Sequence, residues 1–346
     1  GYLNTYFTVK APDERWTNLA ECHELYCAGH LIEAGVAFFQ ATGKRRLLEV
    51  VCRLADHIDS VFGLGENQLR GYPGHPEIEL ALMRLYEVTQ QPRYMALVNY
   101  FVEQRGAQPH FYDEEYEKRG QTSYWHTYGP AWMVKDKPYS QAHQPISEQQ
   151  TAIGHAVRFV YLMTGVAHLA RLSQDEGKRQ DCLRLWKNMA QRQLYITGGI
   201  GSQSSGEAFS SDYDLPNDSV YAESCASIGL MMFARRMLEM EADSQYADVM
   251  ERALYNTVLG GMALDGKHFF YVNPLEVHPK SLKFNHIYDH VKPVRQRWFG
   301  CACCPPNIAR VLTSIGHYIY TPRQDALYIN MYVGNSMEVP VVNGSL

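Results

Sequence analysis

Three of the four residues 301–304 are cysteines, in an otherwise ordinary sequence. Adjacent thiols such as Cys303 and Cys304 can hardly form a disulfide with each other without strain. A soft metal ion explains them better, because it binds thiolate sulfur and keeps it deprotonated. Upstream, Glu223 and Cys225 add a carboxylate and a thiol two positions apart. Together these residues offer more donors than the four that a tetrahedral zinc ion needs.

The metal interpretation predicts a closed or nearly closed zinc site whose ligands are Glu223, Cys225, Cys303 and Cys304. Two distant segments would supply these ligands, which is common in zinc sites. A zinc ion that only stabilises the fold would use the same residues, and so would thiols buried as small apolar groups. No His-Glu-x-x-His motif is present, which excludes the familiar metalloprotease pattern.

A Gly- and Ser-rich segment, 197–209, superficially resembles a phosphate-binding loop. No Gly-Lys-Ser/Thr follows it, and the dinucleotide fingerprint is not matched either, so both interpretations are set aside. The segment does present one carboxylate, Glu207, next to Ala208 and Phe209. Apolar neighbours would raise the pKa of Glu207 by desolvation, as a general acid requires. From the residues alone, a surface loop carboxylate without any catalytic role is the favoured explanation.

Three histidines, His30, His75 and His155, each follow a glycine near the expected start of a helix. Helix N-termini that share one rim of a barrel could direct these rings into a common mouth. Each one taken alone is also explained as an ordinary hydrogen-bonded histidine.

Helical periodicity dominates the rest of the chain, because apolar residues recur at spacings of three and four. Breakers such as Gly43 and Pro92 separate the helical segments. A further helix is expected from Pro305 through Tyr320, since proline is tolerated in a first turn. The eight periodic segments are 17–42, 45–62, 75–89, 92–108, 148–172, 175–193, 219–240 and 243–260.

Helical hairpins of unequal length favour a mainly α fold, an (α/α) barrel in which paired helices form a toroid. The connections 109–147, 196–217 and 262–300 are long and rich in Gly, Tyr and His. Long connections in compact domains are usually functional, and we expect these over one barrel mouth. Residues 268–272 and 326–342 read as strands, and the second of them as the opening of a β-domain.

The composition limits the partners of the chain. Its 346 residues are 46% apolar and 20% charged, which suits a large globular core. The net charge is −5 and the basic residues are scattered, so nucleic acid is not expected as a partner. No apolar run reaches 18 residues, so no membrane span is expected. Eight dispersed cysteines do not resemble a disulfide framework and favour a reducing compartment, the cytoplasm. The start at Gly1 leaves a removed signal peptide open.

Several motifs together resemble glycoside hydrolase family 127, which includes retaining β-L-arabinofuranosidases. They are the Gly-rich loop that ends with residues 206–209, the segments 213–217, 221–227 and 271–275, and above all the run 301–307. The resemblance implies an (α/α)6 barrel with flanking β-sandwich domains. It also implies a catalytic domain over 1–322 without its N-terminal start, and an incomplete β-sandwich over 323–346.

The resemblance also implies roles for individual residues. Cys303 would be both the nucleophile and a zinc ligand, with Cys301 as a neighbour rather than a ligand. Glu207 would be the general acid/base, and Tyr271 would lie near the nucleophile. The remaining zinc ligands would be Glu223, Cys225 and Cys304, and the residues that hold substrate hydroxyls would be His30, His75 and His155.

Three functions remain in competition. The first is a zinc-dependent retaining glycosidase that releases β-L-arabinofuranose from a small-molecule or oligosaccharide substrate. The second keeps the same chemistry and acts on another pentose-like sugar. The third is a non-catalytic, zinc-stapled carbohydrate-binding protein. A homodimer is kept as an open option for the assembly.

Overall fold

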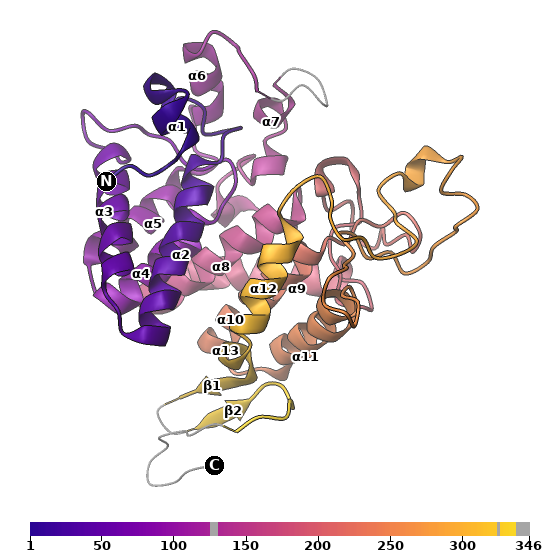
Figure 1. Ribbon diagram of the computed structural model, residues 1–346. Coiled ribbons are helices and arrows are strands. Elements are labelled where there is room, and N and C mark those ends of the chain that lie inside the picture. The colour runs from indigo at the N-terminus through magenta and orange to yellow at the C-terminus, as the bar shows by residue number, and fades with distance from the viewer. Residues whose placement is uncertain (125–130, 324–325, 337–346) are drawn as a thin grey trace. The chain divides into compact units, whose positions relative to one another are not determined.

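The computed structural model describes residues 1–124, 131–323 and 326–336, which form mostly helices (Figure 1). This confirms the mainly α class that the periodicity predicts. The chain divides into two units, Gly1–Trp186 and Lys187–Leu346. The predicted domain boundary between 322 and 323 remains a prediction.

The first unit is built from helical hairpins. Helices α2 and α3 pack against each other, as do α4 and α5, and α4 also contacts α2 and α8. Gly43 ends α2 in the left-handed conformation, and Pro92 occupies the first turn of α5, as the breakers predict. The bounds are Glu24–Thr42 for α2, Arg46–Val61 for α3, Ile78–Thr89 for α4, Pro92–Gln104 for α5, Ala156–Ser173 for α8 and Glu176–Arg192 for α9.

Shorter helices complete this unit: α1 (Tyr6–Val9), α6 (Phe111–Lys118) and α7 (Trp132–Lys135). Helix α6 lies inside a segment that we expect to be a connection. Its anchors are Phe111 and Tyr112, which are buried, and Glu115, which accepts the backbone N–H groups of Leu19 and Ala20. Two turns of helix are too short for periodicity to reveal.

The second unit is organised around α10 (Ser224–Met240), which contacts α11 (Ser244–Arg252) and α12 (Cys304–Thr313). A π-helical turn, Ala253–Leu259, continues α11 and also contacts α10. The described chain ends beyond α13 (Gly316–Ile319) with an antiparallel pair, β1 (Tyr320–Pro322) and β2 (Leu327–Ile329).

Each of the eight periodic segments contains a helix, but the single helix expected from Pro305 through Tyr320 is wrong: non-helical Ser314 divides it into α12 and α13, and Tyr320 already belongs to β1. Three of the eight helices begin well after the start that the periodicity indicates. They start at Glu24, Ala156 and Ser224, because the residue before each start has a non-helical backbone. The strand expected at 268–272 is wrong, since Phe269 and Val272 make only isolated bridges. Within 326–342 only Leu327–Ile329 forms a strand, and residues 337–342 lie outside the described part.

All eight cysteines lie in the described part of the chain and are free thiols there. Among the described helices, none combines the length and the apolar character that crossing a lipid bilayer demands.

Candidate active site

The starts of two packed helices bring the predicted metal ligands together. Glu223 precedes α10 and Cys225 is its second residue, while Cys303 precedes α12 and Cys304 opens it. These helices contact each other, so residues separated by 78 positions meet. The N-terminus of a helix carries partial positive charge, which favours anionic thiolates.

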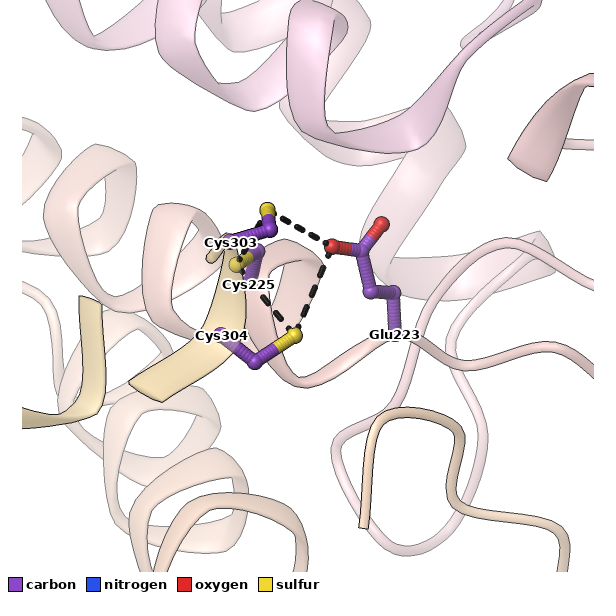
Figure 2. Close-up of side chains that lie close together, drawn as sticks. All are labelled: Glu223, Cys225, Cys303 and Cys304. Carbon is purple, nitrogen blue, oxygen red and sulfur yellow. Dashed lines mark hydrogen bonds between the residues drawn. The ribbon is translucent and has the colours of Figure 1, made fainter. Parts of the chain in front are cut away.

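The four donors surround one small volume (Figure 2). The sulfur of Cys225 lies 3.2 Å from that of Cys303 and 3.5 Å from that of Cys304. One carboxylate oxygen of Glu223, Oε1, faces the thiols at 3.4 Å from Cys303 and 3.6 Å from Cys304. The four donor atoms all lie within 4.8 Å of one another.

These separations fit a tetrahedral zinc ion. Zinc–ligand bonds of about 2.3 Å to sulfur and about 2.1 Å to oxygen place two sulfurs roughly 3.8 Å apart and a sulfur and an oxygen roughly 3.6 Å apart. The sulfur–oxygen distances of 3.4 and 3.6 Å match this geometry. The sulfur–sulfur distances of 3.2 and 3.5 Å are shorter by a few tenths of an ångström. A small outward movement of the thiols would make room for the ion.

Burial makes this cluster costly to charge in the absence of a cation. Glu223, Cys225 and Cys304 are almost completely buried, and burial raises the pKa of each well above its usual value. Hydrogen bonds from Cys225 and Cys304 lower the pKa of Cys303 instead. Cys303, the sulfur of the cluster that is only partly buried, is therefore the thiol that these contacts favour most in its ionised form. A soft divalent cation would offset the cost of ionising Glu223, Cys225 and Cys304 as well.

Glu207 lies next to this cluster. One of its carboxylate oxygens is within 4.8 Å of a carboxylate oxygen of Glu223. The hydroxyl of Tyr221 donates a hydrogen bond to Glu207 Oε1 at 2.8 Å. The backbone of Glu207 is left-handed, with φ +52°, a strained conformation for a residue other than glycine. Such strain is concentrated at functional sites, where the surrounding structure maintains it.

The glycines of the loop 197–206 serve packing rather than phosphate binding. Gly198 has φ +87°, and a Cβ atom there would lie 2.5 Å from the backbone nitrogen of Ala253, where the π-helical turn begins. The backbone N–H of Ala222 donates to the carbonyl of Gly201 at 2.9 Å. The loop is thereby tied to the segment just before α10, which explains how Glu207 comes close to Glu223.

The segment 270–273 is hydrogen-bonded to the start of α10, and these bonds position Tyr271 at the site. The Asn273 side chain donates to the carbonyl of Ala222 at 2.9 Å, and Ser224 N–H donates to the carbonyl of Tyr271 at 2.9 Å. The sulfur of Cys301 lies 3.6 Å from the Tyr271 hydroxyl, and Cys301 is exposed. Tyr271 also contributes a hydrogen bond that lowers the pKa of Cys303.

The three predicted sugar-binding histidines gather in the first unit. The ring of His75 contacts those of His155 at 5.6 Å and Tyr26 at 4.6 Å, and Tyr26 contacts His30 at 4.4 Å. His23 joins the same group through His75 and was not singled out from the sequence.

In two of these rings, those of His75 and His155, hydrogen bonds define which ring nitrogen carries the proton. His75 Nδ1 lies 2.8 Å from the carbonyl oxygen of Pro76, which can only accept, so Nδ1 is protonated. Burial holds the pKa of His75 well below its usual value, so this ring is neutral. In His155, Nδ1 accepts the backbone N–H groups of Val157 and Arg158, so the proton lies on Nε2.

The structure therefore brings together the four predicted ligands, Glu207 and Tyr271 in the second unit. The predicted histidines belong to the first unit, where their rings are linked through contacts of His75 with His155 and Tyr26 and of Tyr26 with His30. Sequence reasoning missed Tyr221 and Asn273 as site residues, although both lie inside the segments on which the family resemblance depends. Nothing in the type or spacing of these two residues distinguishes them from structural ones.

Comparisons with known proteins agree on one family. A model of the "Beta-L-arabinofuranosidase, GH127 catalytic domain" matches residues 1–317. A curated relative, the non-reducing end β-L-arabinofuranosidase of Bifidobacterium longum subsp. longum, is 44% identical over 344 residues. Those residues are 98% of this chain and 52% of the relative.

Solved structures are similar as well. A GH127 β-L-arabinofuranosidase from Geobacillus stearothermophilus T6 has 57% identity and a TM-score of 0.92, over 98% of this chain and 53% of that one. A second GH127 β-arabinofuranosidase has 37% identity and a TM-score of 0.83, over 98% of this chain and 49% of that one. The chain thus spans about half the length of these relatives.

Proposed function

The chain belongs to glycoside hydrolase family 127, and on this premise we propose that it carries the catalytic centre of a retaining β-L-arabinofuranosidase. The observation that carries the proposal is the position of Glu207 beside the cluster of Glu223 and three thiols. A proton donor next to a polarised thiolate is what a double-displacement glycosidase needs. An (α/α)6 barrel and contacts of His30, His75 and His155 with sugar hydroxyls are parts of the same proposal.

We assign zinc to the cluster, with Glu223, Cys225, Cys303 and Cys304 as ligands, because the donor types and their separations suit it. When bound, zinc would keep the Cys303 sulfur ionised near neutral pH and reduce its basicity.

The chemistry of the chain's own residues then follows a two-step path. In the first step, the Cys303 thiolate forms a bond to the anomeric carbon while the glycosidic C–O bond breaks. Glu207 donates its proton to the departing oxygen. In the second step, Glu207 takes a proton from water, whose oxygen attacks the anomeric carbon as the C–S bond breaks. Two displacements retain the β configuration.

The test of this function is hydrolysis of a panel of 4-nitrophenyl furanosides and pyranosides by the protein. We expect turnover of the β-L-arabinofuranoside, and methanol added as acceptor should yield methyl β-L-arabinofuranoside as the first product by NMR. Preference for another pentose would favour the same chemistry on a different sugar. An α-configured product would contradict the double displacement. Intact metal without any turnover would favour the zinc-stapled binding protein.

Removal of the metal is expected to abolish activity and to destabilise the second unit. Elemental analysis should find one zinc per chain. A strong chelator should lower the Tm by about 5 °C or more, since a ligand at 100 times its Kd contributes about 2.7 kcal/mol. Added Zn²⁺ should restore both properties, whereas Mg²⁺ should not, because thiolates are soft ligands. Full activity in metal-free protein would refute the zinc assignment.

A further inference from the structure

The side chains of His30 and Glu77 form a close polar contact between two packed helices of the first unit. His30 lies on α2, and Glu77 immediately precedes α4. His30 Nδ1 is 3.2 Å from Glu77 Oε1. The carboxyl side chain is completely buried, whereas the imidazole is 36% exposed. One side of the ring also contacts Tyr26, edge to face, at a centroid distance of 4.4 Å.

The surroundings show that Glu77 is held in place in spite of its burial. Burial raises the pKa of Glu77, neighbouring Glu79 raises it further, and Arg84 lowers it. On α2, a Cβ atom at Gly29 would lie 2.7 Å from Glu77 Cγ and 2.9 Å from the nitrogen of Ile78. Only glycine allows this close approach of the two helices. A buried carboxyl is unfavourable without a compensating partner, and His30 is such a partner.

Each of the three proposed sugar-binding histidines uses Nδ1 for a contact with a fixed group of the protein. His75 donates from Nδ1 to the carbonyl of Pro76, and His155 accepts at Nδ1 from the start of α8. In His30 the carboxyl of Glu77 takes this place. A hydrogen bond at one ring nitrogen orients the ring and determines what the other nitrogen can do. Backbone groups perform this task for His75 and His155, while His30 depends on a side chain.

We propose that Glu77 is a positioning residue for His30, which it orients through Nδ1 so that Nε2 can serve a sugar hydroxyl. This rests on the proposed function, in which His30 contacts the sugar. Glu77 itself does not touch substrate. Loss of the Glu77 carboxyl therefore weakens sugar binding because the His30 ring is then free to rotate.

The experiment compares Glu77→Gln and Glu77→Leu with a matched control, Glu33→Gln. Both Glu77 variants should raise KM for the aryl β-L-arabinofuranoside about 10-fold with a much smaller change in kcat, as expected for the loss of a hydrogen bond to a polar group that only binds. Glu33 is also buried between α2 and α4, where it pairs with Arg84 at 2.8 Å, but it has no histidine partner in that pair. Its variant should lower the Tm and leave KM unchanged.

Two further measurements separate this proposal from the proposed function. In a His30→Ala background, Glu77→Gln should have no additional effect on KM; an equal effect in both backgrounds would overturn the proposal. Long-range ¹H–¹⁵N spectra, with the His30 signals identified by their loss in His30→Gln, should show one fixed tautomer. In Glu77→Leu the His30 shifts should move toward the averaged values of a free imidazole, and unchanged shifts would overturn the proposal even in a protein without glycosidase activity. If Glu77→Leu fails to fold, the proposal is tested by the KM values of Glu77→Gln and of the double variant that combines His30→Ala with Glu77→Gln.

Discussion

Replacing Cys303 by alanine is expected to reduce kcat for aryl β-L-arabinofuranosides by at least about 10⁴-fold, the scale seen when a covalent nucleophile is removed. The sulfur is the atom that would form the bond to the anomeric carbon, and no neighbouring residue can take its place. Cys225 and Cys304 are buried at 1% and 0% exposure, so their sulfurs cannot reach a substrate. Steady-state kinetics with a good leaving group measures the loss directly.

The matched control for this variant is Cys301→Ala. Cys301 lies two positions away and is exposed, but it is not one of the four clustered donors. We expect its kcat to stay within about 10-fold of the parent, because Cys301 is exposed and contributes only a weak contact to the Tyr271 hydroxyl at 3.6 Å. An electrophilic arabinose analogue should label Cys303 in the Cys301 variant and leave the Cys303 variant unmodified. Undiminished turnover by Cys303→Ala would disprove the nucleophile assignment.

Replacing Glu207 by glutamine is expected to reduce kcat by about 10³-fold for substrates with a sugar or alkyl leaving group, within the range of general acid catalysis. The amide keeps the shape and still accepts the hydrogen bond from Tyr221, but it cannot donate a proton to the departing oxygen. With 2,4-dinitrophenolate as the leaving group the first step needs little protonation. The variant should then form the covalent intermediate and accumulate it.

A series of aryl leaving groups of increasing acidity, compared in the parent and the variant, checks this expectation. The kcat of the parent should depend weakly on the pKa of the leaving group, whereas the kcat of Glu207→Gln should depend on it steeply. Tyr221→Phe is the companion variant, since it removes the hydrogen bond at 2.8 Å and keeps the carboxyl. It should lose about 10-fold in kcat, as a hydrogen bond to a charged group suggests. If Glu207→Gln reduced kcat by the same factor for all substrates, a structural role would explain the residue better than acid/base catalysis.

The elements of this fold could be predicted from local patterns to different degrees. Amphipathic helices such as α3 and α5 show their periodicity directly, because each buries one face along its whole length. The first residues of α8 and α10 could not be predicted from the sequence. The apolar pattern continues through His155 and Glu223, and only their extended backbone conformation ends the helix there. The strand expected at 268–272 has β-forming residues, yet its backbone hydrogen bonds are divided among residues 261–263, Gln296 and the start of α10, so no continuous pairing with one neighbouring strand forms.

The sequence by itself determined which donor atoms this protein can offer, because the types of the residues fix them: three thiols within four residues, with Glu223 and Cys225 upstream. It also determined the family, through motifs that contain Glu207, Glu223 and Cys303. Only the tertiary structure decided that a carboxylate 80 positions away faces Cys303 at 3.4 Å, that Tyr221 donates a hydrogen bond to Glu207, and that Glu77 lies 3.2 Å from His30. Such contacts depend on how helices pack and where glycines let them approach, and periodicity along one chain segment carries no information about either.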